Sequence, residues 1–358
     1  MPPQSLPAAP GTACPPAGRS RHAYVSFLML NDNYLPGALT LAYQLRLQQT
    51  GADLVCLVTD GISSPARSAL EVLYDRVIEV ERFYVPHARR QERQDRPYFF
   101  TRLNSLRLGA DGDLGCAYEK IVVIDADVLP LRDYARLLEV EAPAGIINER
   151  KEHFIETDAA GAYAVAEETR RTGKWVWHRT YDALCPHGRP IPRELTDRVA
   201  SDPANMGING SLFVFAPSAD ELEHIRRDVE RPEVQRLVGD LFDWPDMQYL
   251  TMRWSGHWHS IDARFSGLNG FPALELLCGT HFAGFKPWYF NRGQAMARYA
   301  RYPDYQLWFK VYEQMVAHNQ ALQAMPKLRR LLDQIRQLGC APERQKGASP
   351  QGRRPSVK

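Results

Sequence analysis

The apolar residues of the N-terminal part of the chain alternate between two spacings, which predict strands and helices in turn. An apolar run at 23–30 has the length of a strand, and apolar residues at helical spacing follow over 34–48. A second strand at 54–59, a helix that begins near Pro65 and a short strand at 77–80 continue the series. The order β-α-β-α-β is typical of the nucleotide-binding half of a doubly wound α/β fold.

The most informative stretch is 119–130, which reads Glu-Lys-Ile-Val-Val-Ile-Asp-Ala-Asp-Val-Leu-Pro. Its β-branched residues predict a strand that is buried on both faces, and 96–108 is predicted to be the helix that leads into it. On an extended chain Asp125 and Asp127 would point the same way, at the strand end where open α/β sheets bind ligands. Two such carboxylates suit Mg²⁺ or Mn²⁺, although the triplet taken alone also fits an ordinary polar strand end.

Polar residues gather again at three later points. Asn209-Gly210-Ser211 predicts a polar turn before an apolar strand, where small residues either let a ligand approach or form a tight sheet corner. Asp243 and Asp246 stand at a helix start, where acids complement the helix dipole or act as simple caps. His281 can complete a metal site begun by two carboxylates, and Lys286 can meet a phosphate as a point charge.

Residues 150–203 depart from the strand–helix alternation and predict an insertion or lid. Their histidines match no zinc-ligand spacing. We therefore expect a tail at 1–21, one α/β domain at 22–295 that contains this insertion, helices at 296–340 and a second tail at 341–358. The lack of a GxGxxG motif after the first strand disfavours a dinucleotide site.

Composition narrows the class of protein further. Among 358 residues, 44% are hydrophobic and 24% charged, which is ordinary for a globular protein. The net charge of +2, with no basic block, gives no support to a nucleic-acid partner, and no apolar run predicts a transmembrane segment. Six scattered cysteines without a CxxC pair predict free thiols in a reducing compartment, and hence a cytoplasmic protein.

In their order along the chain, these segments resemble the retaining glycosyltransferases of the glycogenin and galactinol synthase group, glycosyltransferase family 8. The resemblance covers roughly residues 22–290, with an extra segment near 150–203. It is carried by Asn31-Asp32-Asn33-Tyr34 with Gly37-Ala38-Leu39, by Arg102, by Ile124-Asp125-Ala126-Asp127, by Asn209-Gly210-Ser211 and by His281-Phe282-Ala283-Gly284-Phe285-Lys286-Pro287-Trp288.

The resemblance implies a GT-A fold, that is, an α/β fold with a single Rossmann-like nucleotide-binding domain, a mixed central sheet and C-terminal helices. It implies the Mn²⁺-dependent transfer of a hexose, with retention, from UDP-glucose, UDP-galactose or UDP-N-acetylglucosamine; Mg²⁺ is the alternative metal. The acceptor would be a hydroxyl of a separate glycan, polyol or protein, and a homodimer is compatible with the family.

The resemblance also assigns roles to individual residues. The metal would be held by Asp125, Asp127 and His281. The nucleotide and diphosphate would be bound by Leu30, Asn31, Tyr34, Arg102, Ala126, Gly210, Gly284 and Lys286, with Arg102 standing where the family usually has lysine. The donor sugar and acceptor would face Asn209, Asp243 and Asp246, and Asp246 is the candidate to stabilise an oxocarbenium ion.

Two departures from the family bear on function. Met247 stands where the family often has glutamine, and no tyrosine occurs between Tyr249 and Tyr289, the interval in which glycogenin's self-glucosylated tyrosine would lie. We therefore expect no priming of the protein on itself. Two other functions stay open: a sugar nucleotidyltransferase, which would want a glycine-rich basic loop after the first strand, and a non-catalytic UDP-sugar-binding relative.

Overall fold

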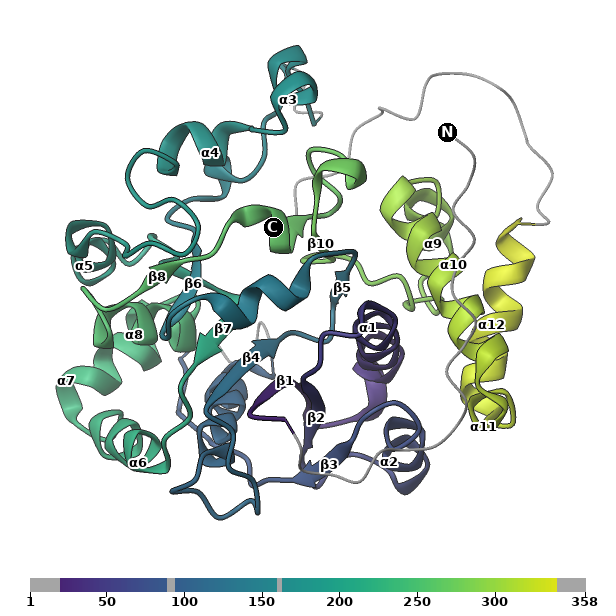
Figure 1. Cartoon of the computed structure of the whole chain (residues 1–358), viewed down its shortest axis with the longest axis horizontal. Coiled ribbons are helices and arrows are strands. Elements are labelled where there is room, and N and C mark those ends of the chain that lie inside the picture. Colours follow the sequence, from purple (N-terminus) through teal and green to yellow (C-terminus); the bar gives the residue numbers. More distant parts are fainter. Residues whose placement is uncertain (1–19, 89–93, 160–162, 340–358) are drawn as a thin grey trace.

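A mixed β-sheet forms the centre of the protein (Figure 1). The structure is a computed structural model, and it describes residues 20–88, 94–159 and 163–339. Within these residues seven strands form the main sheet, in the order β3-β2-β1-β4-β7-β6-β8. They are β1 (His22–Leu28), β2 (Asp53–Val58), β3 (Arg76–Glu79), β4 (Lys120–Ile124), β6 (Ala144–Ile147), β7 (Ile208–Phe215) and β8 (His259–Ser260).

The predicted β-α-β-α-β opening is confirmed. Strands β1, β2, β3 and β4 run parallel, whereas β7 runs antiparallel to both β4 and β6. The predicted mixed sheet is therefore present. Most of the predicted tail at 1–21 and all of the tail at 341–358 lie outside the described residues.

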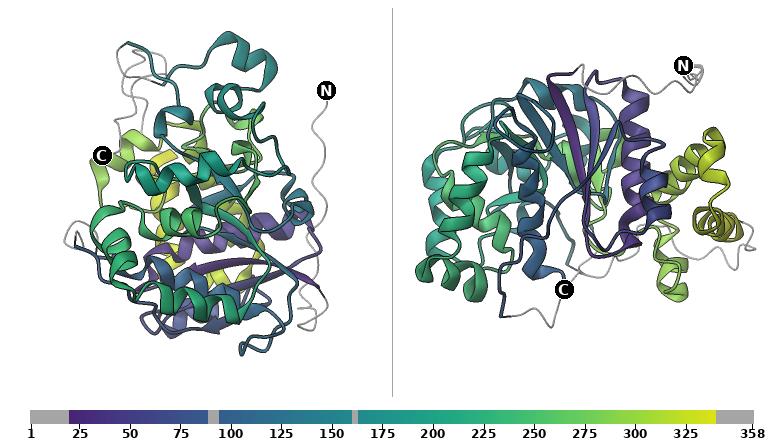
Figure 2. Two further views of the ribbon diagram at one scale, coloured as in Figure 1. Left: turned by 90° about the vertical axis from the view of Figure 1, so that its left-hand side faces the viewer. Right: turned by 90° about the horizontal axis from the view of Figure 1, so that it is seen from below.

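Helices cover both faces of this sheet, as the view from below shows (Figure 2). The α-helices are α1 (Leu35–Gln48), α2 (Ser64–Leu70), α3 (Glu167–Thr172), α4 (Val176–Tyr181), α5 (Arg193–Ser201), α6 (Ala219–Asp228), α7 (Pro232–Gln235), α8 (Pro245–Arg253), α9 (Gly293–Tyr299), α10 (Pro303–His318), α11 (Gln320–Gln323) and α12 (Pro326–Gly339). The C-terminal group α9 to α12 lies beside α1, where Trp308 Nε1 donates to Thr40 Oγ1 at 3.0 Å.

The predicted helix at 96–108 has a tighter winding than expected. Residues Arg96–Leu108 form a 3₁₀ helix, η2, and Tyr134–Glu139 form another, η3. Most of η2 is buried, polar residues included, so it has no clear outer face. Arg102 is buried like its neighbours Leu103 and Leu106, at 8% exposure.

The strand that carries the two aspartates ends earlier than predicted. Strand β4 stops at Ile124, and the amide of Val128 donates to the carbonyl of Asp125 at 3.0 Å, which closes a turn. Asp125 and Asp127 therefore lie on a turn and not on the extended chain assumed from the sequence. The chain then enters a second, three-stranded sheet as β5 (Val128–Pro130), beside β10 (Gly279–His281), which in turn pairs with β9 (Gly267–Leu268).

This small sheet joins two distant parts of the sequence. His281 pairs with Val128 in the antiparallel β5–β10 register, and the amide of Phe282 donates to the carbonyl of Asp127 at 2.9 Å. Backbone hydrogen bonds thus fix the end of β10 beside the aspartate turn.

The 150–203 segment is packed into the protein. It contains α3, α4 and α5, and Trp175, Trp177 and Tyr181 are almost completely buried in the common hydrophobic core. Trp177 Nε1 donates to the carbonyl of Ile147 at 2.9 Å, which ties α4 to the end of β6. A lid role for this segment stays a prediction.

A close backbone approach holds α1 against the aspartate turn. A Cβ atom at Gly37 would lie 2.2 Å from the carbonyl oxygen of Ala126 and 2.5 Å from the ring of Trp288. Neither neighbour can retreat without moving the turn or the C-terminal helices.

We predict that Gly37→Ala lowers the free energy of unfolding by about 1–3 kcal/mol, because it overpacks a tight contact. Gly293→Ala is the matched control, since an added Cβ there meets nothing within 4 Å. Its effect should stay within about 0.5 kcal/mol. Urea denaturation of both variants measures the difference, and equal stabilities would show that α1 does not constrain the turn.

Candidate active site

Three potential metal ligands converge beside the end of β4. One ligand atom from each of Asp125, Asp127 and His281 lies within 4.8 Å of the others. Asp125 and Asp127 belong to the turn between β4 and β5, and His281 ends β10. The convergence of these three residues, which the sequence predicted, is therefore present in the fold.

The unmatched polar atoms of this cluster fit a divalent cation. Asp125 Oδ1 and Asp127 Oδ1 are buried and make no hydrogen bond among the described residues; the nearest cationic or imidazole groups are Arg102 Nη1, 3.2 Å from Asp125 Oδ1, and His281 Nε2, 3.4 Å from Asp127 Oδ1. Buried oxygen and nitrogen atoms without a partner are costly. Carboxylate and imidazole together suit Mn²⁺ or Mg²⁺, and a cation would satisfy these atoms.

Lys286 neutralises one of the two aspartates. Its Nζ lies 2.5 Å from Asp127 Oδ2 and also donates to the carbonyl of Phe282. Burial raises the pKa of Asp127, but the charges of Lys286 and His281 outweigh burial and hold this pKa well below its ordinary value. Asp127 is therefore ionised and ready to bind a cation.

Arg102 is the second cation of the site and contacts four groups at once. Its Nη1 lies 3.2 Å from Asp125 Oδ1, and its Nε lies 3.1 Å from Asp246 Oδ2. It also donates to the carbonyl of Gly210, and its guanidinium stacks over the ring of Phe27 at 4.8 Å. Arg102 thus joins four segments that are far apart in the sequence.

The charge of Asp125 is only partly compensated. Burial, together with the nearby carboxylates of Asp127 and Asp246 and partly offset by Arg102 and His281, raises the pKa of the Asp125 carboxyl to about 6. This aspartate is therefore the member of the pair that gains most from a bound cation.

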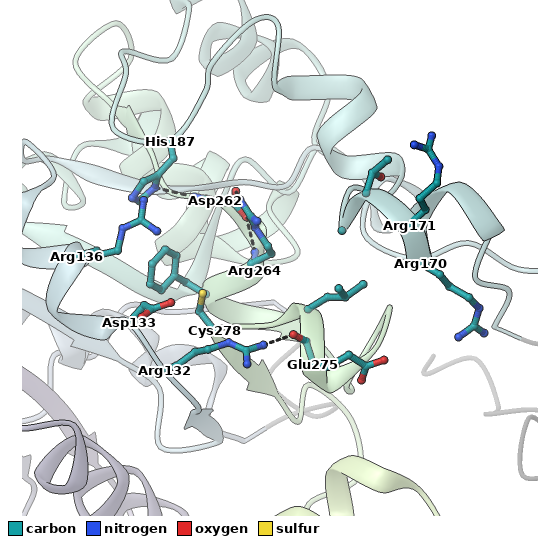
Figure 3. Close-up of a pocket in the computed structure, with 14 residues that line it drawn as sticks. Arg132, Asp133, Arg136, Arg170, Arg171, His187, Asp262, Arg264, Glu275 and Cys278 are labelled. Atoms are coloured by element: carbon teal, nitrogen blue, oxygen red, sulfur yellow. Dashed lines mark hydrogen bonds and ion pairs between the residues drawn. The ribbon is translucent and has the colours of Figure 1, made fainter. Parts of the chain in front are cut away.

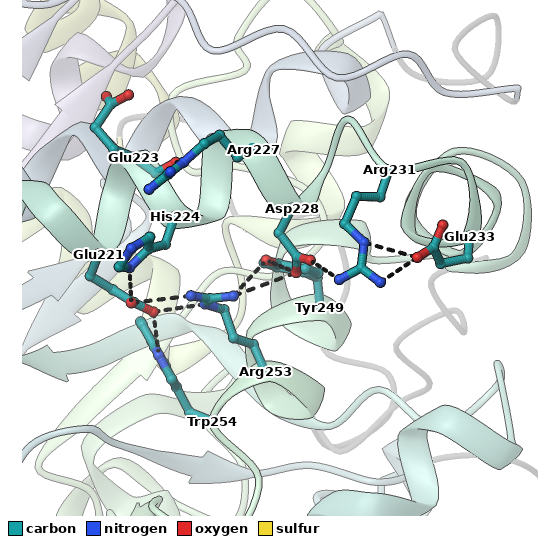
Figure 4. A network of polar contacts seen from close by, with 10 residues as sticks. All are labelled: Glu221, Glu223, His224, Arg227, Asp228, Arg231, Glu233, Tyr249, Arg253 and Trp254. Atoms are coloured by element: carbon teal, nitrogen blue, oxygen red, sulfur yellow. Dashed lines mark hydrogen bonds and ion pairs between the residues drawn. The ribbon is translucent and has the colours of Figure 1, made fainter.

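Asp246 is buried at 1% exposure in the first turn of α8. A polar network fixes α8 against α6 (Figure 4). Arg253 contacts both oxygens of Glu221, at 2.7 and 3.1 Å, and Tyr249 donates to Asp228 at 2.7 Å. Because these contacts anchor α8 along its length, they set the position of its first turn and so of Asp246.

The Asn209-Gly210-Ser211 segment lies inside β7 and not in the predicted turn before a strand. A Cβ at Gly210 would lie 2.7 Å from Met247 Cγ and 3.0 Å from Arg102 Nη1. Because Gly210 has no side chain, the side chains of Met247 and Arg102 can pack against its backbone. The small residue thus makes room for the protein's own side chains. Asn209 is buried, and its Oδ1 accepts the amide of Ser211 at 2.9 Å.

Three of the predicted nucleotide-binding residues, Leu30, Asn31 and Tyr34, lie between β1 and α1. Tyr34 has its ring 5.6 Å from Lys286 Nζ and edge-to-face with Trp288 at 5.6 Å, so it borders the cluster. Leu30 adopts a left-handed backbone conformation, with φ of 69°, and Asn31 Oδ1 caps the short helix that follows. No hydrogen bond or ion pair among the described residues joins Leu30 or Asn31 to the metal cluster.

The remaining predicted residues occupy nearby segments. Ala126 is buried in the aspartate turn, and Gly284 is half-buried between His281 and Lys286. Asp243 is half-buried, two residues before α8. Sequence reasoning missed Phe27, whose ring lies under Arg102; it was interpreted only as part of a strand, and its partner comes from a helix far along the chain.

Comparisons with known proteins show which family part of this chain is similar to. Residues 25–174 match the family model Glycosyl transferase family 8. Glycogenin-1 of Caenorhabditis elegans is 38% identical over 109 residues, which are 30% of this chain and 24% of that protein. The uncharacterised protein R707 of Acanthamoeba polyphaga mimivirus is 25% identical over 280 residues, which are 75% of this chain and 83% of that protein.

Among solved structures, the galactosyltransferase LgtC in complex with donor and acceptor sugar analogues is similar over 81% of this chain and 94% of that chain. The TM-score is 0.49 and the sequence identity 15%. The matched segment covers only about a quarter of glycogenin-1. The expected resemblance to family 8 is confirmed over residues 25–174, the expected α/β class with a mixed central sheet is confirmed, and the family match indicates a glycosyltransferase.

We predict that Mn²⁺ stabilises the protein through this cluster. At a concentration of about 100 times Kd, bound metal adds about 2.7 kcal/mol to the free energy of unfolding. His281→Ala should weaken Mn²⁺ binding by more than about 100-fold, since even loss of an outer-shell partner costs about 10–100-fold. Thermal unfolding with and without Mn²⁺ measures the gain.

His257→Ala is the matched control, because His257 is exposed and lies on a loop. It should keep the full stabilisation by Mn²⁺. If His281→Ala gained as much stability as the wild type, His281 would not be a ligand.

Proposed function

We propose, from the match to family 8 and from the geometry of the site, that the protein is a retaining glycosyltransferase that moves a hexose from a UDP-sugar to a hydroxyl of a separate acceptor. UDP-glucose, UDP-galactose and UDP-N-acetylglucosamine are the candidate donors, and a glycan, polyol or protein the acceptor. The observation that supports this most is the convergence of Asp125, Asp127 and His281, with Lys286 beside them.

Breaking the bond to a UDP leaving group requires charge stabilisation on the diphosphate. Mn²⁺ held by Asp125, Asp127 and His281 would act as a Lewis acid on the diphosphate oxygens. Lys286 is a flexible point charge with one carboxylate partner, so it can turn from Asp127 toward a phosphate oxygen. Tyr34, next to Lys286, borders the same space and would contact the nucleotide.

The other face of the donor sugar needs a negative group to stabilise positive charge at the anomeric carbon. Asp246 is the candidate, because its carboxylate is buried and held by Arg102. Asn209 and Asp243 come from neighbouring segments and would contact the sugar and acceptor. Arg102 is fixed by Asp125, Asp246 and the Gly210 carbonyl, so its proposed role is to position both carboxylates.

The two alternative functions are less well supported. A sugar nucleotidyltransferase would use a glycine-rich basic loop after β1, where the chain has Asn31-Asp32-Asn33. A non-catalytic relative would be favoured by a broken metal cluster, whereas all three positions are filled and close together.

The cellular setting of this activity rests on sequence predictions. In the described part of the chain, no helix combines the length and apolar character that crossing a bilayer requires. A cytoplasmic location and a homodimer stay predictions.

We predict that the protein releases UDP from a UDP-sugar in the presence of Mn²⁺. Asp125→Asn should lower the rate of this release by about 100-fold or more, since several kcal/mol of charge stabilisation disappears with the metal.

Asp125→Asn is a better probe than Asp127→Asn. Asp127 is buried and paired with Lys286, and its loss would leave that cation uncompensated.

Asp333→Asn, an exposed position on α12, is the control and should keep the wild-type rate. A coupled assay of UDP release over the three donors, with Mn²⁺ or EDTA, gives the comparison. Near-normal turnover of Asp125→Asn would contradict the metal role, and tight UDP binding without any hydrolysis or transfer would favour the non-catalytic alternative.

We predict that the protein does not glycosylate itself, because the interval between Tyr249 and Tyr289 contains no tyrosine. Incubation with UDP-glucose and Mn²⁺ should leave the intact mass unchanged. Added hexose masses in the mass spectrum would overturn this prediction.

A further inference from the structure

A second pocket lies at the opposite end of the small sheet from the metal cluster. Its volume is about 410 Å³, and it is lined by η3, the end of α3 and the segments around Arg264 and Cys278 (Figure 3). Cys278 precedes β10 and His281 ends it. Three residues of strand at about 3.3 Å each separate the two sites by about 10 Å.

Arginine dominates the lining of this pocket. Five arginines line it, together with His187 and three carboxylates. The arginines are Arg132, Arg136, Arg170, Arg171 and Arg264. In Figure 3, Arg136 and His187 lie together on one side, and Arg170 and Arg171 stand on α3 on the opposite side.

One of the three carboxylates is already fully engaged. The carboxylate of Asp262 accepts hydrogen bonds from the Arg264 guanidinium at 2.6 and 3.0 Å. It also lies 3.2 Å from Nε2 of the buried His178. The thiol of Cys278 adds no negative charge at neutral pH, because burial raises its pKa to about 11. The exposed Asp133 and Glu275 are thus the remaining acids that face four further arginines.

Those four arginines form no ion pair with any carboxylate in the described part of the chain. Elsewhere on the surface many arginines do, as in the pairs Arg82–Asp60 and Arg107–Asp113. Arg132 is held in place by the backbone carbonyls of Leu274 and Glu275. With five arginines against three carboxylates, the lining of the pocket carries a net positive charge.

His187 adds a neutral donor to this cationic wall. The amide of Asp262 donates to its Nδ1 at 3.2 Å, so the ring proton resides on Nε2. The ring stacks on Phe265, with centroids 5.4 Å apart, which fixes its orientation. An imidazole N–H beside a guanidinium is suited to bind an oxygen anion.

We propose that this pocket binds an oxyanion, a phosphate or a carboxylate group, at a site separate from the donor site. Guanidinium groups bind both anions through paired N–H donors. Arg136, with His187 beside it, is the principal contact of the anion. Arg170 and Arg171 add positive charge from α3, on the opposite side of the pocket. The anion belongs either to a free phosphorylated small molecule or to an acidic sugar residue of a glycan.

The test is isothermal titration of the full chain, in EDTA at low salt, with inorganic pyrophosphate and separately with an oligomer of galacturonic acid. Arg136→Gln should weaken binding at least tenfold, because it removes a charged hydrogen-bond donor. Arg330→Gln, an exposed position on α12, should bind as the wild type does. Equal melting temperatures of Arg136→Gln and Arg330→Gln establish that the fold is intact.

Binding of pyrophosphate alone identifies a free phosphate ligand, and binding of the galacturonic acid oligomer identifies an acidic glycan; either result supports the site. No binding of either probe, or equal affinity in Arg136→Gln, overturns the proposal. UDP release without acceptor should be unchanged in Arg136→Gln, so this outcome is independent of the proposed transferase activity.

Discussion

The structure depends on the compensation of buried negative charge beside the end of β4. Asp125, Asp127 and Asp246 are brought together with little access to water, and such a cluster is unfavourable unless cations accompany it. Arg102 and Lys286 supply them. Since these two residues come from η2 and from the segment after β10, the charges can be matched only when the small sheet and the main sheet are both in place.

The two cations compensate this charge in different ways. Arg102 is planar, sits over Phe27 and donates to a backbone carbonyl, so its position is determined by the fold itself. Lys286 is also buried and donates to the carbonyl of Phe282, but it is a single point charge with one carboxylate partner. A diphosphate that arrives with a metal can therefore replace Asp127 as the partner of Lys286 without disturbing Arg102. The permanent part of the site and the part that exchanges with the ligand are thus carried by different residues.

The sequence predicted much of this arrangement because the relevant signals are local. The apolar run before Asp125, the turn residues after β1 and the spacing of α1 each specify an element within a few residues. The burial of Arg102 could not be predicted from such local signals. Its partners Phe27, Gly210 and Asp246 lie on three different elements, and an arginine in a helical pattern is normally assigned to the outer face. The sequence also could not predict the 3₁₀ winding of η2, because apolar spacings of three and four residues overlap in a short segment.

The 150–203 segment shows how packing and recognition are joined in this fold. Trp177 donates to Ile147, Tyr181 donates to Glu149, and His178 contacts Asp262, so buried polar contacts fix α4 on several sides. Opening this helix would expose those groups together with two tryptophans. Asp262 also holds Arg264, which lines the arginine-rich pocket. The same carboxylate therefore anchors the segment and orders one wall of the pocket, which argues that this wall is preformed before any ligand arrives.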